Sequence, residues 1–333
     1  MQTDVFARNP VLRGYWYAVA QSIDVAPGPL AVTVLGEPLV LWRTTDGALT
    51  AARDRCPHRE APLSLGRVVE SGLQCPYHGW TFGASGVCVR IPSAPPARAV
   101  PPTARLTPVH ATERYGLAWV SLDAPVADIP AMAYDGDPRF RRLNTPVEVW
   151  RVSATRMADN FMDIAHVPWV HTETFGRAQH PEVPPLTLEP LDDTFYGYRY
   201  TIEAKNPDAA TVTSGSQAPV VTRWMTTGFA VPFTTRSTIR YATGLEHVLL
   251  LLTTPIDDVT SYFTFVVWRN DDCAVPADEV IAFDRRIGRE DQAMLERIPG
   301  VLSLDVAATA SVQADRPSLA WRRWFAALLQ GAA

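Results

Sequence analysis

Hydrophobic and polar positions alternate with a short period through the first third of the chain. Between Gly36 and about Leu122, apolar runs such as PLVLWR, ALTAARDRC and VCVRI are separated by turn sequences such as TDG and GASG. A period of two residues between glycine-bearing turns is typical of antiparallel β-strands. The pattern predicts a small antiparallel β domain with its core at about 36–122.

Proline then interrupts the pattern twice. Residues 91–103 (IPSAPPARAVPPT) contain too much proline for a regular element, and residues 123–140 form a second polar, proline-bearing passage. The second passage is typical of an exit from a domain. We therefore expect a first domain over residues 1–145 and a second over 146–333.

The second domain shows longer periods. Residues 152–169 (VSATRMADNFMDIAHVPW) have helical propensities and are expected to end or kink near Pro168. Long β-prone runs follow, and residues 277–298 again have helical periodicity. These runs are FYGYRYTIEA, FTTRSTIRYA, HVLLLLTTP and SYFTFVVWRN. The order helix, antiparallel sheet, helix predicts an α+β fold.

Composition excludes some classes of function. The 333 residues are 47% hydrophobic, enough for a sizeable core, and 30 basic against 35 acidic residues give a net charge of −5 without a basic cluster. We expect no nucleic-acid partner. The N-terminus has no signal-peptide layout and the longest apolar run is too short to span a bilayer. We therefore expect a cytoplasmic protein with no membrane partner.

The cysteines are too few for a disulfide framework, so metal binding or core packing is expected of them. Two of the four lie in a C-x-H and a C-x-x-H motif, Cys56 with His58 and Cys75 with His78, separated by sixteen residues. Thiolate and imidazole suit zinc or an iron–sulfur cluster. Because each loop supplies one of each, the order favours a Rieske cluster, with zinc or unrelated core and surface residues as the alternatives.

A second set of polar residues lies in the helix at 152–169. Asn160, Asp163 and His166 share one broad face at a period of 3.6 residues, and His171 follows Pro168. Two histidines and a carboxylate form the facial triad of non-haem Fe(II) enzymes. Ordinary polar residues near a helix end are the alternative.

The third member of a triad has to come from elsewhere, and Asp291 is the candidate. It falls within a predicted apolar stripe of the C-terminal helix. The stripe residues are Val280, Ile287, Met294 and Ile298. A carboxylate on an apolar face is costly unless it is paired or binds metal, so a salt-bridged acid is the alternative.

The other acids of this helix are expected to lie off the stripe, Asp284 at its edge and Glu290 and Glu296 pointing away. Cys88 and Cys273 have no partner at ligand spacing and are expected to be structural.

Both motifs resemble those of one enzyme family. CPHREAPLSLG followed by CPYHGWTF is similar to the Rieske signature of ring-hydroxylating oxygenases, and residues 160–171 match that family's N/D-x-x-D-x-x-H-x₄-H pattern. A late aspartate, matched by Asp291, completes the pattern. The chain looks most like the vanillate O-demethylase and dicamba monooxygenase group of oxygenase components.

The resemblance implies site residues and a fold. Cys56, His58, Cys75 and His78 would hold the [2Fe-2S] cluster; His166, His171 and Asp291 would hold mononuclear Fe(II); Asp163 and Asn160 would be the catalytic residues. It also implies an antiparallel β Rieske domain followed by a helix-grip, START-like catalytic domain. In the family's homotrimer, Asp163 would bridge a Rieske histidine of one chain and an iron-ligating histidine of the next.

The implied function is that of the terminal oxygenase component of a monooxygenase. O₂ would be the co-substrate, and a separate NAD(P)H-dependent reductase or ferredoxin would supply electrons, since no G-x-G-x-x-G follows a strand and opens a helix. A small aromatic or heterocyclic substrate would undergo O- or N-demethylation or hydroxylation. Hydroxylation or desaturation of an unactivated carbon in an alicyclic compound or natural product, and a Rieske-type electron carrier, are the alternatives.

The pocket is expected in residues 223–244 and 263–268, which mix aromatic, aliphatic and hydroxyl side chains as ordinary sheet faces also do. Arg223, Arg236 and Arg240 are candidates for holding a carboxylate or, equally, for surface salt bridges. Glu60 places a negative charge beside the first loop, where the family often has a small or apolar residue; it is expected to lower the cluster potential or mark the reductase contact.

Overall fold

The computed structural model describes residues 6–95, 98–271, 273 and 275–331. The chain divides into two compact units. One spans Leu12–Asp128, and the other joins the residues before Leu12 to those after Asp128. The domain boundary near residue 145 stays a prediction. Each unit is described by itself.

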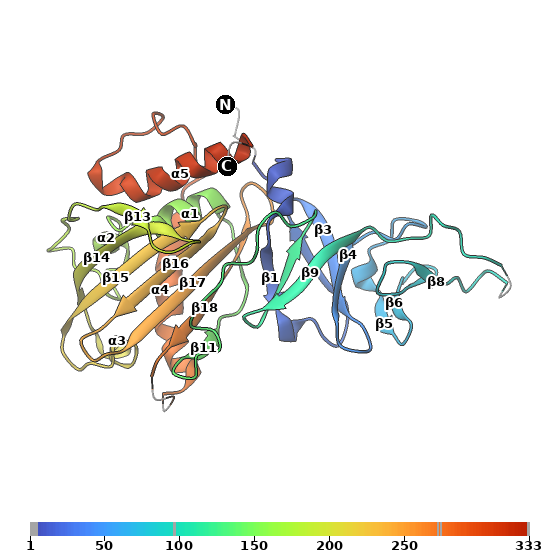
Figure 1. Cartoon of the computed structure of the whole chain (residues 1–333), viewed down its shortest axis with the longest axis horizontal. Coiled ribbons are helices and arrows are strands. Elements are labelled where there is room, and N and C mark those ends of the chain that lie inside the picture. The colour runs from blue at the N-terminus through green and yellow to red at the C-terminus, as the bar shows by residue number, and fades with distance from the viewer. Residues whose placement is uncertain (1–5, 96–97, 272, 274, 332–333) are drawn as a thin grey trace. The chain divides into compact units, whose positions relative to one another are not determined.

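The Leu12–Asp128 unit consists of two antiparallel sheets (Figure 1). The larger has the order β1-β10-β9-β4-β3-β2 and the smaller the order β5-β6-β7-β8. Their strands are β1 (Tyr17–Gln21), β2 (Leu30–Val34), β3 (Glu37–Arg43), β4 (Leu49–Arg53), β5 (Arg67–Val69), β6 (Gly72–Gln74), β7 (Thr81–Phe82), β8 (Cys88–Arg90), β9 (Pro108–Arg114) and β10 (Leu117–Ser121). Short 3₁₀ turns occur at Ser22–Asp24 and Leu63–Leu65, and a third, Pro10–Gly14, begins two residues before the unit. The predicted antiparallel β domain is confirmed.

The second unit is built on one antiparallel sheet of the order β11-β18-β17-β16-β15-β14-β13, with β12 also pairing β18. Its strands are β11 (Arg141–Asn144), β12 (Glu148–Trp150), β13 (Leu188–Pro190), β14 (Tyr196–Lys205), β15 (Val220–Ala230), β16 (Thr234–Arg240), β17 (Glu246–Pro255) and β18 (Ser261–Arg269). Its helices are α1 (Ala154–Met162), α2 (Val167–Val170), α3 (Asp208–Ser214), α4 (Ala277–Leu295) and α5 (Arg316–Leu329), with a 3₁₀ turn at Gln313–Asp315. The predicted α+β fold is confirmed. No helix in the described part of the chain is long and apolar enough to cross a membrane.

Helix α4 covers the sheet. Val280 and Leu295 pack with Phe263 and Phe265 of β18 in one apolar cluster, so burial of this face holds the helix across the strands. Helix α5 packs on α1 (Figure 1). The fold thereby brings α1 and α4, far apart in sequence, to the same sheet.

Helices α3 and α5 were not predicted, and the structure differs from the predicted elements elsewhere as well. Residues 152–169 are not one helix that ends near Pro168: α1 ends at Met162, and Pro168 lies in the first turn of α2. Asp163 breaks the helix because its backbone is extended and its carboxylate accepts the N–H groups of Ala165 and His166, both at 2.9 Å. Strand β15 was not predicted, although it pairs with β14 along its length.

Candidate metal centres

The first candidate centre is formed by two loops of the smaller unit. Cys56 and His58 follow β4, and Cys75 and His78 lie between β6 and β7. Both thiols are buried, whereas His58 is half-buried and His78 exposed. The two imidazole rings are 4.5 Å apart, and His58 also stacks on Trp80 at 4.5 Å. The structure therefore gathers these imidazoles at the surface and the thiols beneath it.

The two loops share one backbone design. In each loop the cysteine N–H donates to the carbonyl five residues further on, at 3.0 Å for Cys56 and 2.8 Å for Cys75. The cysteine carbonyl accepts the N–H four residues on, from Glu60 and Gly79 respectively. Glu60 has φ 60° and Gly79 φ 69°, both in the left-handed region that favours glycine. Glu60 is thus the counterpart of Gly79, and its carboxylate pairs with Arg55.

The chemistry of these loops fits a bound cationic cluster. Burial raises the pKa of the Cys56 thiol to about 11, and Cys75 beside it raises it as well, while the backbone N–H groups of His58 and Arg59 lower it. Buried thiolates therefore need a positive partner. The buried Nδ1 of His58 has no hydrogen-bond partner among the described residues. That Cys56, His58, Cys75 and His78 hold a [2Fe-2S] cluster stays a proposal.

The other two cysteines lie outside this centre. Cys88 is buried in β8, as expected of a structural cysteine. Cys273 is exposed in a loop, and its structural role stays a prediction.

The second candidate centre lies between α1, α2 and α4. One ligand atom each from His166, His171 and Asp291 lie within 4.8 Å of one another. His166 Nε2 is 3.2 Å from His171 Nε2, and Asp291 Oδ1 is 3.5 Å and 3.4 Å from these nitrogens. His171 and Asp291 are buried and His166 is partly so. This is the arrangement of a two-histidine, one-carboxylate metal site.

Each histidine is oriented by a carboxylate on its other ring nitrogen. Asp163 Oδ2 lies 2.9 Å from His166 Nδ1, and Glu290 Oε2 lies 2.9 Å from His171 Nδ1. Thr174 donates its hydroxyl to the same Glu290 oxygen at 2.7 Å. A carboxylate acceptor places the ring proton on Nδ1 and leaves the Nε2 lone pair free for a metal.

This protonation pattern makes the centre fit a cation. With both protons on Nδ1, the two Nε2 lone pairs face each other at 3.2 Å, next to the Asp291 carboxylate. Three electron-rich atoms at this separation repel one another unless a positive charge lies among them. Burial lowers the pKa of His166, but the opposite effect of the Asp163 and Asp291 carboxylates is larger, so the pKa of His166 is raised overall. The surroundings favour positive charge at this point.

Asn160 is the remaining predicted residue of this site. Its Nδ2 donates to Asp291 Oδ1 at 3.1 Å and so helps to orient the carboxylate. The break after α1, rather than one continuous helical face, brings Asn160, Asp163 and His166 together. Their roles stay a prediction.

Two expectations about α4 are corrected. The predicted apolar stripe is wrong at its C-terminal end, since Met294 is 47% and Ile298 39% exposed, although Asp291 is buried. Glu290 does not point away from the site: it holds His171. Asp284 is buried, with its carboxylate 3.0 Å from His247 Nε2. The hydrophobic pattern had no signal for Glu290, because its partner lies 119 residues away.

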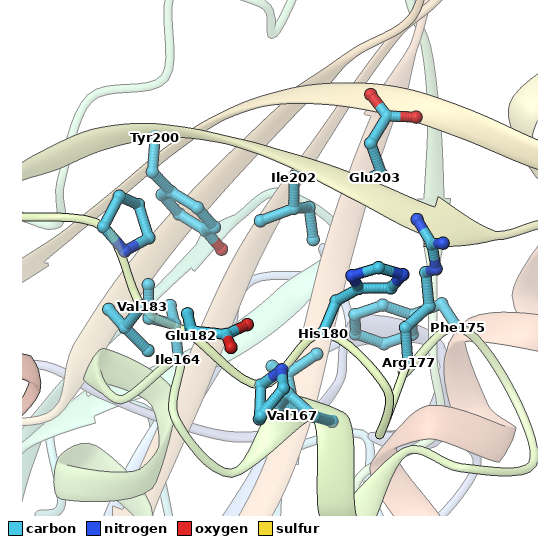
Figure 2. Close-up of a pocket in the computed structure, with 13 residues that line it drawn as sticks. Ile164, Val167, Phe175, Arg177, His180, Glu182, Val183, Tyr200, Ile202 and Glu203 are labelled. Atoms are coloured by element: carbon cyan, nitrogen blue, oxygen red, sulfur yellow. The ribbon is translucent and has the colours of Figure 1, made fainter.

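A cavity of about 60 Å³ opens beside this centre. Figure 2 shows Tyr200 and Ile202 pointing from β14 toward Val167 and Phe175. Phe175 also stacks on the imidazole of His171, with ring centroids 5.0 Å apart. The cavity wall is therefore in direct contact with the candidate metal site.

Two family models match the chain. The Rieske [2Fe-2S] domain matches residues 15–106. The vanillate O-demethylase oxygenase C-terminal domain matches residues 150–331, more than half of the chain.

Individual proteins are similar over nearly the full length. Methylxanthine N1-demethylase NdmA of Pseudomonas putida is 32% identical, over 94% of this chain and 88% of its own. A putative toluene-4-sulfonate monooxygenase system iron-sulfur subunit, TsaM2 of Comamonas testosteroni, is 30% identical, over 92% and 95%. The structure of Pseudomonas putida NdmA with caffeine has a TM-score of 0.81 at 28% identity, covering 97% of this chain and 93% of the other. The chain therefore belongs to the vanillate O-demethylase-type family of Rieske oxygenase components, enzymes that carry a [2Fe-2S] cluster and non-haem iron, use O₂ and receive electrons from a separate reductase or ferredoxin.

Proposed function

We propose that this protein removes a methyl group from oxygen or nitrogen of a small aromatic or heterocyclic substrate. The observation that carries the proposal is the convergence of His166, His171 and Asp291 beside the cavity. The related N-demethylases, and the vanillate O-demethylase family model over residues 150–331, favour demethylation. Two further relatives are named as subunits of toluene-4-sulfonate monooxygenase systems, so the substrates named for the relatives include an aromatic anion.

In this proposal His166, His171 and Asp291 hold the mononuclear iron, and Cys56, His58, Cys75 and His78 hold the cluster. When bound, these groups would use O₂, two electrons and two protons to insert one oxygen atom into the substrate C–H bond and release the other as water. A methyl group oxidised in this way leaves as formaldehyde. Asp163 and Glu290 keep the Nδ1 protons in place, and Asn160 orients the third ligand.

We further propose that the protein works in the cytoplasm as a homotrimer, with electrons entering the iron site from a neighbouring chain past Asp163. An open polar hollow of about 300 Å³ supports this route. It reaches Asn160 and Asp163 and is bordered by Arg156 and Arg322. Asp163, which lines this hollow and contacts His166 Nδ1, would connect an approaching histidine to His166.

The test is turnover of the purified protein with a generic reductase on methoxylated aromatics, N-methyl heterocycles and alicyclic compounds. Formaldehyde is expected from a member of the first two classes. Hydroxylated product without formaldehyde, from whichever class, would overturn demethylation.

Asp163→Asn tests the route. Loaded with excess iron to offset the weaker support of His166, it is expected to keep three irons per chain and the cluster spectrum while lowering formaldehyde release about ten- to a hundredfold, since the charged link to His166 is lost. Undiminished turnover at full iron content would contradict the role given to Asp163.

A further inference from the structure

Arg223 differs from the other arginines near it. Arg236 pairs with Asp192, and Arg240 donates to Glu246 at 3.0 Å. Arg223, on β15, is only 2% exposed, yet no carboxylate among the described residues lies within ion-pair distance of it. Its Nε and Nη2 are buried and donate to no described residue. A buried guanidinium without a counter-charge is unfavourable unless something outside the fold supplies one.

The two unpartnered nitrogens form the side edge of the guanidinium. Elsewhere in this chain the same edge holds a carboxylate with both bonds: Arg13 binds Asp123 at 2.9 and 3.1 Å, and Arg322 binds Asp159 at 2.7 and 2.9 Å. This fork matches the two oxygens of a planar acid. For Arg223, no residue in the described part of the chain supplies those oxygens.

Arg223 is held next to the cavity. Its guanidinium carbon lies 4.6 Å from the Phe175 ring centre and 5.7 Å from that of Tyr241. Phe175 lines the cavity and stacks on His171, and Ile202, another lining residue, is the register partner of Arg223 on β14. Opposed residues of neighbouring strands share a face of the sheet. Arg223 itself does not line the cavity, and its guanidinium is separated from the proposed iron ligand by the Phe175 ring.

A second donor lies beside it. The buried Tyr241 hydroxyl has no hydrogen-bond partner among the described residues. Burial raises the pKa of Tyr241, against an opposite effect of Arg223, so the phenol keeps its proton and can donate. Asp284, the buried acid that acts on Tyr241, lies against His247 at 3.0 Å instead of pairing with Arg223.

We propose that Arg223 binds the anionic group of the substrate, with the Tyr241 hydroxyl as a second donor. The substrate class is thus an aromatic acid, a carboxylate or a sulfonate. The inference rests on the proposed function, because it assigns a substrate to the same iron site. Charge and fork shape both favour the acid over a neutral analogue of equal size.

The experiment measures binding to the iron-loaded holoenzyme by calorimetry, with benzoate, benzenesulfonate and benzamide as probes. Benzoate or benzenesulfonate is expected to bind at least about tenfold more tightly than benzamide, and the tighter of the two identifies the acid. Arg223→Met should lower affinity for that anion about ten- to a hundredfold and leave benzamide unchanged, since one charge-assisted fork is lost. Tyr241→Phe should have a smaller effect in the same direction.

Arg240→Met is the matched control, because Arg240 is exposed and paired with Glu246; it should not change any of these affinities. Arg223→Lys keeps the charge without the fork and should retain part of the anion preference. Arg223→Met should also keep or raise the midpoint of thermal unfolding, whereas a purely structural arginine would lower it. If Arg223→Met does not fold, the Lys variant carries the test by its reduced preference.

Two outcomes would overturn the inference: both anions binding no more tightly than benzamide to the wild-type protein, or unchanged anion affinity in the folded Arg223 variants. Iron content and reduction of the cluster are measured on the same samples. If these are normal, the failure concerns Arg223 alone; if iron is absent, the proposed function has failed as well.

Discussion

The two candidate centres are built in opposite ways. The loops at Cys56 and Cys75 are closed by hydrogen bonds within six residues, and their backbone repeats the same turn twice. The site at His166, His171 and Asp291 is assembled from segments more than a hundred residues apart, and a carboxylate braces each histidine.

This difference in construction determines which parts of the fold each centre needs in order to bind its metal. A ligand set in two short loops needs those loops to close, and little else outside its own unit. A ligand set drawn from helices and a helix break needs the whole second unit to be folded, including residues that never touch the metal. Substitution of a ligand in the first centre should therefore affect that centre alone. Metal binding in the second centre should also weaken when a supporting residue that does not touch the metal is substituted.

The largest expected effect comes from removing a ligand from either centre. Cys75→Ser should abolish the visible absorbance of the cluster and leave one iron per chain, whereas Asp291→Ala should keep the cluster and its two irons and lose the third. Either variant should lose turnover. Metal analysis and electron paramagnetic resonance on folded protein give the result. Loss of all iron in both variants would contradict the independence of the centres.

The same pair of variants tests whether electrons cross between chains. Co-expression of Cys75→Ser with Asp291→Ala should restore part of the activity in mixed oligomers, since an intact cluster would then face an intact iron site of a neighbour. No recovery from oligomers shown to be mixed would mean that each chain serves its own iron.

Sequence reasoning succeeded where the determinants are local. The loop motif at Cys56 and Cys75 is readable because the ligand spacing and the turns lie within the same few residues. The alternating strands of the first unit follow from their own side chains. The interleaved order of cysteine and histidine also carried the resemblance to the family, which the two family models bear out.

It failed where a residue's role depends on a distant partner. The break at Asp163 is local, made by its carboxylate accepting the N–H groups of Ala165 and His166, but Glu290 matters only because His171, 119 residues away, lies across from it. Asp291 was found for a partly wrong reason, since Met294 beside it is exposed. From the sequence Arg223 resembled any strand arginine; of the three candidates Arg223, Arg236 and Arg240, only Arg223 has no counter-ion among the described residues.

An intermediate effect is expected from removing the charge of Glu290, which contacts His171 Nδ1. Glu290→Gln keeps the size of the side chain but removes the charged acceptor of His171 Nδ1, so affinity for the mononuclear iron should fall about ten- to a hundredfold. Competition with a chelator measures the change, and the cluster spectrum should stay the same.

The matched control is Glu296→Gln at the C-cap of the same helix, where the carboxylate contacts Arg151 and Gln292 outside the site. It should leave iron affinity unchanged. Equal losses from the two variants would show that helix charge, and not the contact with His171, governs iron binding.

The smallest expected effect is local to the first centre. Glu60 has the left-handed backbone that its counterpart Gly79 adopts without a Cβ, and among the residues that the structure describes its carboxylate pairs only with the exposed Arg55. Glu60→Gly should therefore raise the free energy of unfolding of the holoprotein by about 1 kcal/mol or less, because relief of the strained backbone outweighs a weak surface pair. Glu60→Ala removes the same ion pair but keeps the strain, so it should be less stable than the glycine variant by about 1 kcal/mol. Thermal or denaturant unfolding of both variants measures the difference. If the alanine variant is as stable as the glycine variant, the backbone at Glu60 is not strained in the way that its similarity to Gly79 implies.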